Sequence, residues 1–184
     1  MFNFLCKHIF RLLGWKVKGT FPDSLKKAIF IVCPHYVWFD FFLGLGSRAE
    51  IDKPIGYLGK KELFDNKFFG WFFYATGGQP VNRFKNHNVV DAVAELFDSK
   101  EKLFIAIAPE GTRKNVDRLR TGFYYMALAS KVPLMFVGFE FPTKTVIFHD
   151  VPFYPTGNFE EDMKVIKSFY RTVKGPKKNW LLND

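Results

Sequence analysis

The sequence predicts an α/β fold: a single domain in which helices flank a mixed, mostly parallel central sheet. The chain has 184 residues, which is a usual size for one domain. Hydrophobic residues make up 48% of it, enough to build a substantial core. Short apolar runs typical of buried strands alternate with segments whose apolar residues recur at helical spacing, and this alternation is the pattern of α/β domains.

The N-terminal segment, residues 1–19, predicts a basic amphipathic helix ahead of the main domain at residues 20–184. Its apolar side chains recur at helical spacing, and its cationic side chains lie between them. Such a helix can lie on an anionic bilayer or pack on its own domain, and the pattern leaves both open. Because charges interrupt the apolar residues and no small-residue cleavage site follows, we do not expect a signal peptide, nor do we expect any segment to span a membrane.

The elements of the main domain are expected where turn-forming residues bound the apolar runs. Strands are expected at Ala28–Cys33, Pro54–Leu58, Gln79–Asn82, Leu103–Ala108, Pro133–Phe139 and Thr145–His149. Helices are expected at Asn88–Ser99, Gly122–Ser130 and Glu160–Val173, the first capped by Asn88 and the last closed by Gly175-Pro176.

The overall charge predicts a polyanionic partner. Lys and Arg outnumber Asp and Glu by 27 to 18, which gives a net charge of +9. This charge favours nucleic acid, an anionic membrane surface or a phosphorylated substrate, and does not choose among them. The two cysteines, Cys6 and Cys33, lie in apolar surroundings and form no CxxC pair, so we expect neither a disulfide framework nor a zinc site. This favours a reducing compartment, the cytoplasm.

The first chemically informative turn follows the strand expected at Ala28–Cys33. There the sequence reads CPHYVWFD, with His35 just beyond the strand and Asp40 five residues on. Pro34 keeps the preceding residue extended, so His35 lies at the exit of a strand, where ligands bind in α/β sheets. An Asp40 in the first turns of a following helix can accept a hydrogen bond from one ring nitrogen and leave the other free as a base. A structural histidine near an incidental aspartate also fits this short pattern.

A second turn of this kind follows the strand expected at Leu103–Ala108 and reads PEGTR. Gly111 lets the backbone approach a ligand, Thr112 supplies a hydroxyl, and Arg113 is a bidentate donor for phosphate. Alone, the motif also fits an ordinary polar turn. Parallel strands would place the two turns side by side, and this favours one joint site.

Basic residues follow two of the weaker strands. Lys60 and Lys61 come after the strand at Pro54–Leu58, and Arg83 comes after GGQPVN. Each can reach a phosphate at the same edge of the sheet, and each also fits a solvated surface charge.

Four ordered blocks of the sequence, PHYVWFD, GGQPVNR, PEGTR and VPLMFVGF, resemble the glycerolipid acyltransferases, the family of 1-acyl-glycerol-3-phosphate acyltransferase, over residues 17–140. The resemblance implies that His35 is a general base oriented by Asp40. It also implies that the phosphate of the acyl acceptor is bound by Arg83 and by the block Glu110, Gly111, Thr112 and Arg113. Lys61, ahead of Glu62-Leu63-Phe64, is implied to lie near that phosphate.

The function that the resemblance implies is transfer of a fatty acyl group from acyl-CoA or acyl carrier protein to the hydroxyl of a lysophospholipid such as 1-acyl-glycerol-3-phosphate. We expect direct transfer, because no cysteine or serine stands in a nucleophile position beside the histidine. No cofactor is expected, and no metal, because His, Cys, Asp and Glu show no ligand spacing. A cytoplasmic enzyme held peripherally at the inner face of the cell membrane would reach such a substrate.

Departures from the family pattern leave the acceptor open. Members acting on lysophosphatidic acid often have Asn-His and a serine two residues after the histidine, where this chain has Pro34 and Val37. The fourth block has Gly138 where a proline is frequent, and the second has Asn82 where Asp or a hydrophobic residue is usual. The acceptor can therefore be a lysophosphatidic acid, another lysophospholipid or a lyso-amino-lipid.

Other classes of protein share part of this pattern. A single-stranded nucleic-acid binder also combines basic charge with aromatics, but here the aromatics lie in apolar runs, so no nucleic-acid partner is expected. A non-catalytic peripheral membrane protein built on the same scaffold would not need the intact His35 and Asp40. A hydrolase using the same histidine with water would release free fatty acid without an acceptor.

Overall fold

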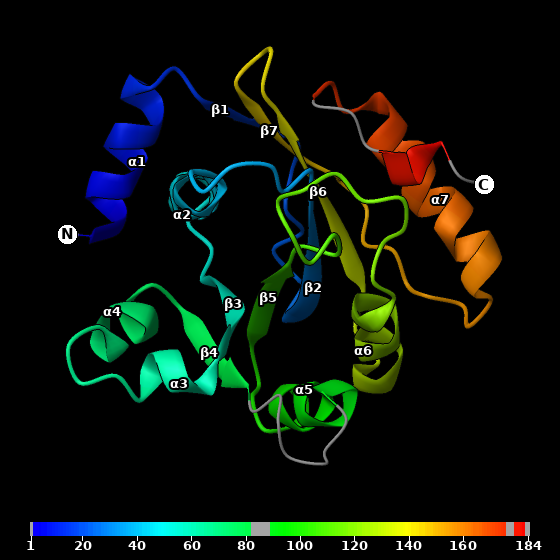
Figure 1. The fold of residues 1–184 in the computed structure, drawn as a ribbon, viewed down its shortest axis with the longest axis horizontal. Coiled ribbons are helices and arrows are strands. Elements are labelled where there is room, and N and C mark those ends of the chain that lie inside the picture. Colours follow the sequence, from blue (N-terminus) through cyan, green and yellow to red (C-terminus); the bar gives the residue numbers. More distant parts are fainter. Residues whose placement is uncertain (1, 82–88, 176–178, 183–184) are drawn as a thin grey trace.

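The computed structural model describes residues 2–81, 89–175 and 179–182, and these form one α/β domain (Figure 1). The strands are β1 (Lys16–Lys18), β2 (Lys27–Cys33), β3 (Ile55–Lys60), β4 (Gly78–Val81), β5 (Leu103–Ile107), β6 (Leu134–Glu140) and β7 (Thr145–Phe148). The α-helices are α1 (Phe2–Leu12), α2 (Asp40–Glu50), α3 (Lys61–Phe64), α4 (Gly70–Ala75), α5 (Val89–Asp98), α6 (Gly122–Ser130) and α7 (Phe159–Thr172). A 3-10 helix, η1, spans Asn179–Leu181.

The described strands form a seven-stranded sheet in the order β1-β7-β6-β2-β5-β3-β4. Strands β6 and β7 pair antiparallel, and every other neighbouring pair is parallel. The predicted mixed, mostly parallel sheet flanked by helices is therefore confirmed. The two longest strands, β2 and β6, lie side by side at its centre because their apolar sequences tolerate burial on both faces.

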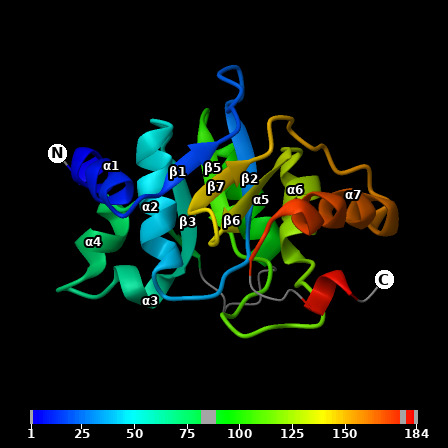
Figure 2. The same cartoon turned by 90° about the horizontal axis from the view of Figure 1, so that it is seen from above.

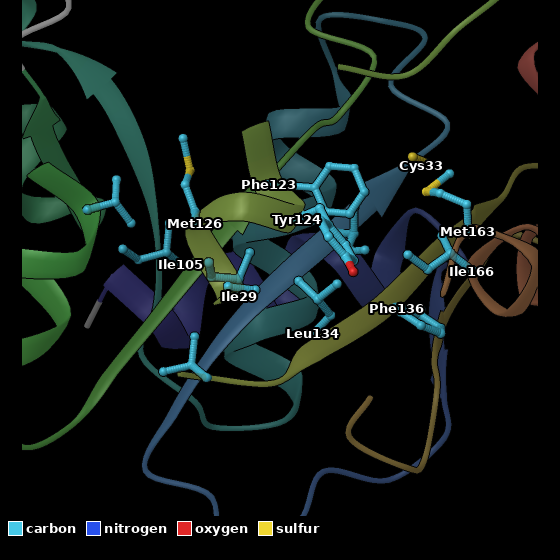
Figure 3. Packing of buried hydrophobic residues seen from close by; sticks show 14 of the residues in the cluster. Ile29, Cys33, Ile105, Phe123, Tyr124, Met126, Leu134, Phe136, Met163 and Ile166 are labelled. Carbon is cyan, nitrogen blue, oxygen red and sulfur yellow. The ribbon is translucent and has the colours of Figure 1, made fainter. Parts of the chain in front are cut away.

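Residues alternate between the two faces of the sheet along each central strand. On one face, Ile29 and Ile31 of β2 and Ile105 of β5 are fully buried beneath α5, α6 and α7. We call this side the packed face. Figure 3 shows its cluster around Tyr124 and Phe136.

The opposite side is covered chiefly by α2, and we call it the α2 face. Here Phe30 of β2, Phe104 of β5 and Val137 of β6 pack toward Leu43 of α2 and Phe10 of α1. The single-residue alternation between the two clusters is the period-2 pattern of strands that are buried on both sides.

The N-terminal helix is shorter than the predicted segment 1–19. Helix α1 ends at Leu12, Gly14 then adopts a left-handed φ of +79°, and the chain continues as β1, which pairs with β7. Phe10 is its one fully buried side chain, and a Cβ added to Gly46 of α2 would collide with that ring. The helix thus packs on the domain through Phe10 and leaves most of its apolar residues exposed.

Other differences from the expected elements are local. Helices α3 and α4 and strand β1 were not predicted, because each has only three to six residues and carries no clear period. Strand β4 ends at Val81. Asn82, the expected cap Asn88 and Pro176 lie outside the described residues. Within the described ranges, the structure contains no helix that is both long enough and apolar enough to cross a membrane.

Candidate active site

The two turns singled out from the sequence emerge from neighbouring strands. Strands β2 and β5 pair in parallel, with Ile31 opposite Ile107, so the residues after Cys33 and after Ile107 leave the same edge of the sheet. This places the histidine turn beside the PEGTR turn, as a parallel arrangement of the two strands requires.

His35 and Asp40 are in direct contact across the first of these turns. Asp40 is the first residue of α2, and its Oδ2 lies 3.1 Å from Nδ1 of His35. The same oxygen accepts hydrogen bonds from the backbone N–H groups of Tyr36 and Val37, at 2.6 and 2.9 Å. The side chain of Asp40 is 1% exposed, whereas that of His35 is 30% exposed. The turn therefore wraps around the carboxylate and presents the imidazole.

The contact bears on which imidazole nitrogen is available for chemistry. Nδ1 of His35 lies within hydrogen-bonding distance of Asp40, and because a carboxylate only accepts hydrogen bonds, this contact favours the tautomer with its proton on Nδ1. The lone pair of a neutral imidazole is then on Nε2, which makes no hydrogen bond with any residue in the described ranges. This arrangement can remove a proton from a hydroxyl group placed at Nε2.

Glu110 occupies a different place from the one that the resemblance implies. Its carboxylate is buried, accepts a hydrogen bond from the backbone N–H of His35 at 2.5 Å and another from Nε1 of Trp180 at 3.4 Å, and does not line the cavity described below. Glu110 holds the histidine turn from behind, whereas Gly111, Thr112 and Arg113 of the same block line the cavity. A part of Glu110 in binding the acceptor phosphate stays a prediction.

A cavity of about 830 Å³ opens in front of His35 and Asp40. Its polar wall comes from the loop after β5 and includes Thr112, Arg113 and Arg120. Gly111 also lines it with a left-handed φ of +66°, and a Cβ there would collide with the side chain of Arg120. Among the described residues, neither guanidinium group of this wall forms an ion pair with a carboxylate. The wall is therefore suited to an anion such as a phosphate group.

Much of the apolar wall of the same cavity lies between α2 and the sheet, and Phe123 and Met126 of α6 add to it from the packed face. Phenylalanine side chains supply much of it, and they come from both layers: Phe30, Phe41, Phe139 and Phe148. Gly44 of α2 also lines the cavity, and a Cβ added to it would meet no atom within 4 Å. The glycine thus leaves open space where a larger residue would project toward the sheet. This part of the cavity is suited to a hydrocarbon chain.

Arg48 is a buried cation at the edge of this apolar wall. Its Nη1 donates hydrogen bonds to the backbone carbonyls of Ile55 and Thr76, at 2.9 and 2.6 Å. Burial lowers the pKa of its guanidinium group from the usual value. These bonds fix the end of α4 against the start of β3, so Arg48 acts first as a structural residue of the cavity wall.

The remaining predicted site residues are not all brought to the cavity. Lys61 is the first residue of α3, directly after β3, and its exposed side chain is not part of the cavity lining. Arg83 lies outside the described residues, although Val81, the last residue of β4, does line the cavity. In the described part of the chain, no group of three or more His, Cys, Asp or Glu side chains is arranged to hold a metal ion.

The structure adds residues that the sequence reasoning did not single out. Arg120 lies seven positions beyond Arg113 and reaches the same wall because the intervening loop folds back, with the N–H of Arg120 donating to the carbonyl of Pro109 at 2.8 Å. Trp180 reaches Glu110 from the far end of the chain. The signal for Arg120 was its place directly before the sequence TGFYYM that begins a helix; no local signal marks Trp180.

The fold and this site together define an α/β enzyme domain with a histidine–aspartate pair beside a cavity that has a cationic wall and an apolar wall. A family model described as Acyltransferase matches residues 16–140, and the chain belongs to the acyltransferase family. The glycerolipid acyltransferase resemblance noted in the sequence is in agreement with this match.

Named relatives and a solved structure give the same picture. The chain is 33% identical over 132 residues to the 1-acyl-sn-glycerol-3-phosphate acyltransferase of Bacillus subtilis, a match that covers 71% of this chain and 64% of that protein. It is 32% identical over 133 residues to the Escherichia coli protein of the same name, covering 67% of this chain and 52% of that protein. The chain thus spans between half and two thirds of the length of these relatives. The crystal structure of the 1-acyl-sn-glycerophosphate acyltransferase of Thermotoga maritima shares the fold, with a TM-score of 0.61, 18% identity, and coverage of 94% of this chain and 76% of that one.

Proposed function

We propose that this protein transfers a fatty acyl group from an acyl thioester, acyl-CoA or acyl carrier protein, to the hydroxyl of a lysophospholipid such as 1-acyl-glycerol-3-phosphate. The names of the relatives support this choice of acceptor. The observation that carries the proposal is the opening of the His35–Asp40 pair onto one cavity that has a cationic wall and an apolar wall. A lysophospholipid offers a hydroxyl, an anionic head and a hydrocarbon chain, so its chemistry matches all three features.

In the proposed reaction, Nε2 of His35 removes the proton of the acceptor hydroxyl while the hydroxyl oxygen attacks the carbonyl carbon of the thioester. The carbon–sulfur bond breaks, and the departing thiolate takes the proton from the imidazolium. The products are an ester and a free thiol, and no acyl-enzyme forms. Asp40 fixes the tautomer of the imidazole and stabilises its charged form.

The cavity walls divide the remaining tasks. Thr112, Arg113 and Arg120 are proposed to bind the phosphate of the acceptor, with Gly111 allowing the loop to approach it. Arg83 and Lys61 remain candidates from the sequence. The apolar wall around Gly44 is proposed to hold an acyl chain. The proposal needs no metal or other cofactor, and it places the enzyme in the cytoplasm, peripherally bound to the inner, anionic face of the cell membrane.

Transfer of a labelled acyl group from acyl-CoA to a panel of lysolipids tests the function. The wild type should acylate one acceptor, and His35→Ala should lower its kcat by roughly 10²- to 10⁴-fold, which is the usual contribution of a general base. His149→Ala is the matched control, because His149 lies outside the cavity lining and should leave transfer unchanged. Circular dichroism and the urea midpoint would establish that both variants are folded.

The other readings give distinct results in this assay. Acylation of a lyso-amino-lipid alone would change the acceptor and leave the mechanism intact. Free fatty acid released without an acceptor would indicate a hydrolase. If acyl-CoA fails and acyl carrier protein succeeds, the donor is the carrier protein. Anionic-vesicle binding by the wild type and His35→Ala alike, with no transfer from either donor, would overturn the enzymatic proposal in favour of a non-catalytic membrane-binding protein.

A further inference from the structure

A continuous series of aromatic rings leads away from the mouth of the cavity. Trp38 lies within the catalytic turn, between His35 and Asp40, and is 67% exposed. Its ring packs edge-on against Phe42 of α2, with the centroids 5.8 Å apart. Phe42 in turn contacts Phe41, one of the residues that line the cavity. Aromatic side chains therefore connect the solvent surface directly to the candidate active site.

The same series continues to α4. Phe41 contacts Phe72, with centroids 6.5 Å apart, and Phe72 contacts Trp71 at 6.2 Å. Around Trp71, which is 70% exposed, lie further exposed aromatics of the segment that leads into and through the helix. We call the exposed members of this series the aromatic strip: Trp38, Phe42, Phe68, Phe69, Trp71 and Tyr74.

Local contacts fix the backbone around α4 and keep its flanking aromatic side chains exposed. Asn66 Oδ1 accepts hydrogen bonds from the backbone N–H groups of Phe68 and Phe69, at 2.9 and 3.1 Å, which fixes the turn before α4. Gly70 then lies so close to the carbonyl of Phe64 that an added Cβ would come within 2.2 Å of its oxygen. The backbone of α4 is thus held tightly against the buried Phe64, and the flanking residues Phe69 and Trp71 remain exposed.

Helix α1 adds a second apolar surface at the same end of the molecule. In both views α1 and α4 lie beside α2 at one end, and α7 lies at the other (Figures 1 and 2). The exposed side chains of α1 include Leu5, Ile9 and Leu12. A soluble monomer rarely exposes this many large apolar residues together, so the surface indicates a partner.

The charges around the strip indicate what that partner is. Lys60 and Lys61 lie where β3 passes into α3, Lys67 lies between α3 and α4, and none of the three forms an ion pair with any residue of the described ranges; α1 contributes Lys7. Tryptophan, tyrosine and phenylalanine beside unpaired lysines are the composition of surfaces that rest at the boundary between lipid headgroups and acyl chains. Anionic headgroups neutralise the lysines while the rings enter the upper acyl region.

We propose that the aromatic strip docks on an anionic bilayer and that lipid passes from it to the cavity past Trp38. This inference rests on the proposed function, because it supplies the route by which a lysophospholipid reaches His35. The strip joins α4 to the catalytic turn, so docking brings the cavity mouth to the membrane surface and shortens the distance over which an insoluble substrate must leave the bilayer.

Vesicle binding tests the docking step without any chemistry. The variant Phe68→Ser/Trp71→Ser should bind phosphatidylglycerol–phosphatidylcholine vesicles roughly 10- to 100-fold more weakly than the wild type in co-sedimentation, because two large apolar side chains no longer enter the lipid. The control Val151→Ser/Tyr154→Ser removes two exposed apolar side chains from the loop between β7 and α7 and should bind as the wild type does. Equal binding by the strip variant would overturn the proposal.

Two further outcomes of the vesicle experiment also test whether the aromatic strip docks on an anionic bilayer. Wild-type binding that is as strong on pure phosphatidylcholine as on the anionic mixture would overturn the role given to the lysines. If the wild type binds neither vesicle but self-associates in sedimentation velocity, and Phe68→Ser/Trp71→Ser is monomeric, the strip is an interface between copies of the chain and the bilayer proposal is wrong.

Activity separates this inference from the proposed function. With lysolipid embedded in vesicles, Phe68→Ser/Trp71→Ser should lose activity by the same factor as binding. With a short-chain lysolipid dissolved as monomers, it should keep the wild-type rate, because the cavity is unaltered. A wild type inactive on every substrate would overturn the proposed function, and the vesicle experiment would still decide the docking.

Discussion

The two faces of the sheet are built from the same strands but serve different ends. On the packed face, three helices and η1 cover the strands, and side chains as large as Tyr124, Tyr170 and Trp180 are almost completely buried. On the α2 face, one helix covers the strands near the carboxyl edge of β2 and β5, and a cavity of about 830 Å³ lies at this edge, lined chiefly from the α2 face but also by Phe123 and Met126 of α6. The packed face is therefore the more completely filled side of the sheet, and most of the residues that border the cavity belong to the α2 face.

Two glycines illustrate how the chain achieves this difference. A Cβ at Gly138 of β6 would lie 2.5 Å from a methyl group of Val173, so this glycine gives its space to a side chain of the packed face. A Cβ at Gly44 of α2 would meet nothing within 4 Å, so this glycine leaves its space open. Glycine therefore allows close packing at one position and leaves unfilled space at the other.

The largest expected effect separates the two faces by equal truncations on one strand. Phe136→Ala, on the packed face of β6, should lower the free energy of unfolding by about 3–5 kcal/mol, because it leaves a void in a filled core. Phe139→Ala, on the α2 face, should cost roughly 1–3 kcal/mol, because its ring already borders the cavity and loses fewer contacts. Urea unfolding monitored by fluorescence measures both. Equal losses would contradict the division between the faces.

Glu110 accepts hydrogen bonds from the histidine turn and from Trp180 of the packed face. Changing it should affect catalysis more than substrate binding. Glu110→Gln keeps an oxygen for the N–H of His35 but removes the charge that strengthens this bond, so kcat should fall about 10- to 100-fold with little change in KM for the acceptor. Glu160→Gln, at an exposed position in the first turn of α7, is the matched control. A rise in KM with an unchanged kcat would instead indicate that Glu110 contacts the acceptor.

Substitutions of the two glycines should change stability by different amounts. Gly138→Ala should destabilise the fold by about 1–3 kcal/mol, because Val173 must move. Gly44→Leu should leave stability within about 1 kcal/mol of the wild type, because the helix gains from losing a glycine. The added side chain should fill part of the apolar wall and shift the preferred acyl chain to a shorter length, as a competition assay with acyl-CoA mixtures measures. An unchanged chain preference would place the acyl chain elsewhere.

The smallest expected effect is an alkaline sensitivity of the packed face. Burial and the neighbouring Asp162, which accepts a hydrogen bond from Tyr124 at 2.7 Å, raise the pKa of Tyr124 to about 12. This folded-state pKa exceeds the unfolded value of about 10. The protonated phenol therefore makes its full contribution to the free energy of unfolding below pH 10, and this contribution declines as pH rises toward 12. Tyr124→Phe should cost about 1 kcal/mol at neutral pH and flatten this decline. Unfolding curves at pH 8 to 11.5 measure it, with Tyr154→Phe as the exposed control.

Much of the candidate site follows from local sequence. The apolar runs before His35 and Glu110 determine two strand exits, and proline after each strand prevents its continuation. Given parallel strands, the proximity of the two turns follows without further information. The contact between His35 and Asp40 needs only a short turn and a helix start, which a spacing of five residues allows.

Features that depend on packing were beyond such reasoning. The sequence assigns Glu110 to the same polar block as Arg113, yet the first faces back toward Trp180 and the second lines the cavity, since successive residues of a turn point in different directions. The sequence of helix α4 shows no helical periodicity of apolar residues. The exposure of its aromatic side chains follows from contacts with Phe64 and Asn66 and not from amphipathic spacing.

The sequence by itself determined the fold class, the family and the positions of the two reactive turns, because these depend on hydrophobic periodicity and on motifs of neighbouring residues. The tertiary structure alone decided which elements line the cavity, which arginines border it, and how the aromatic strip meets it. These depend on where side chains distant in sequence leave space or fill it, and close packing of that kind is a property of the assembled layers and not of any single segment.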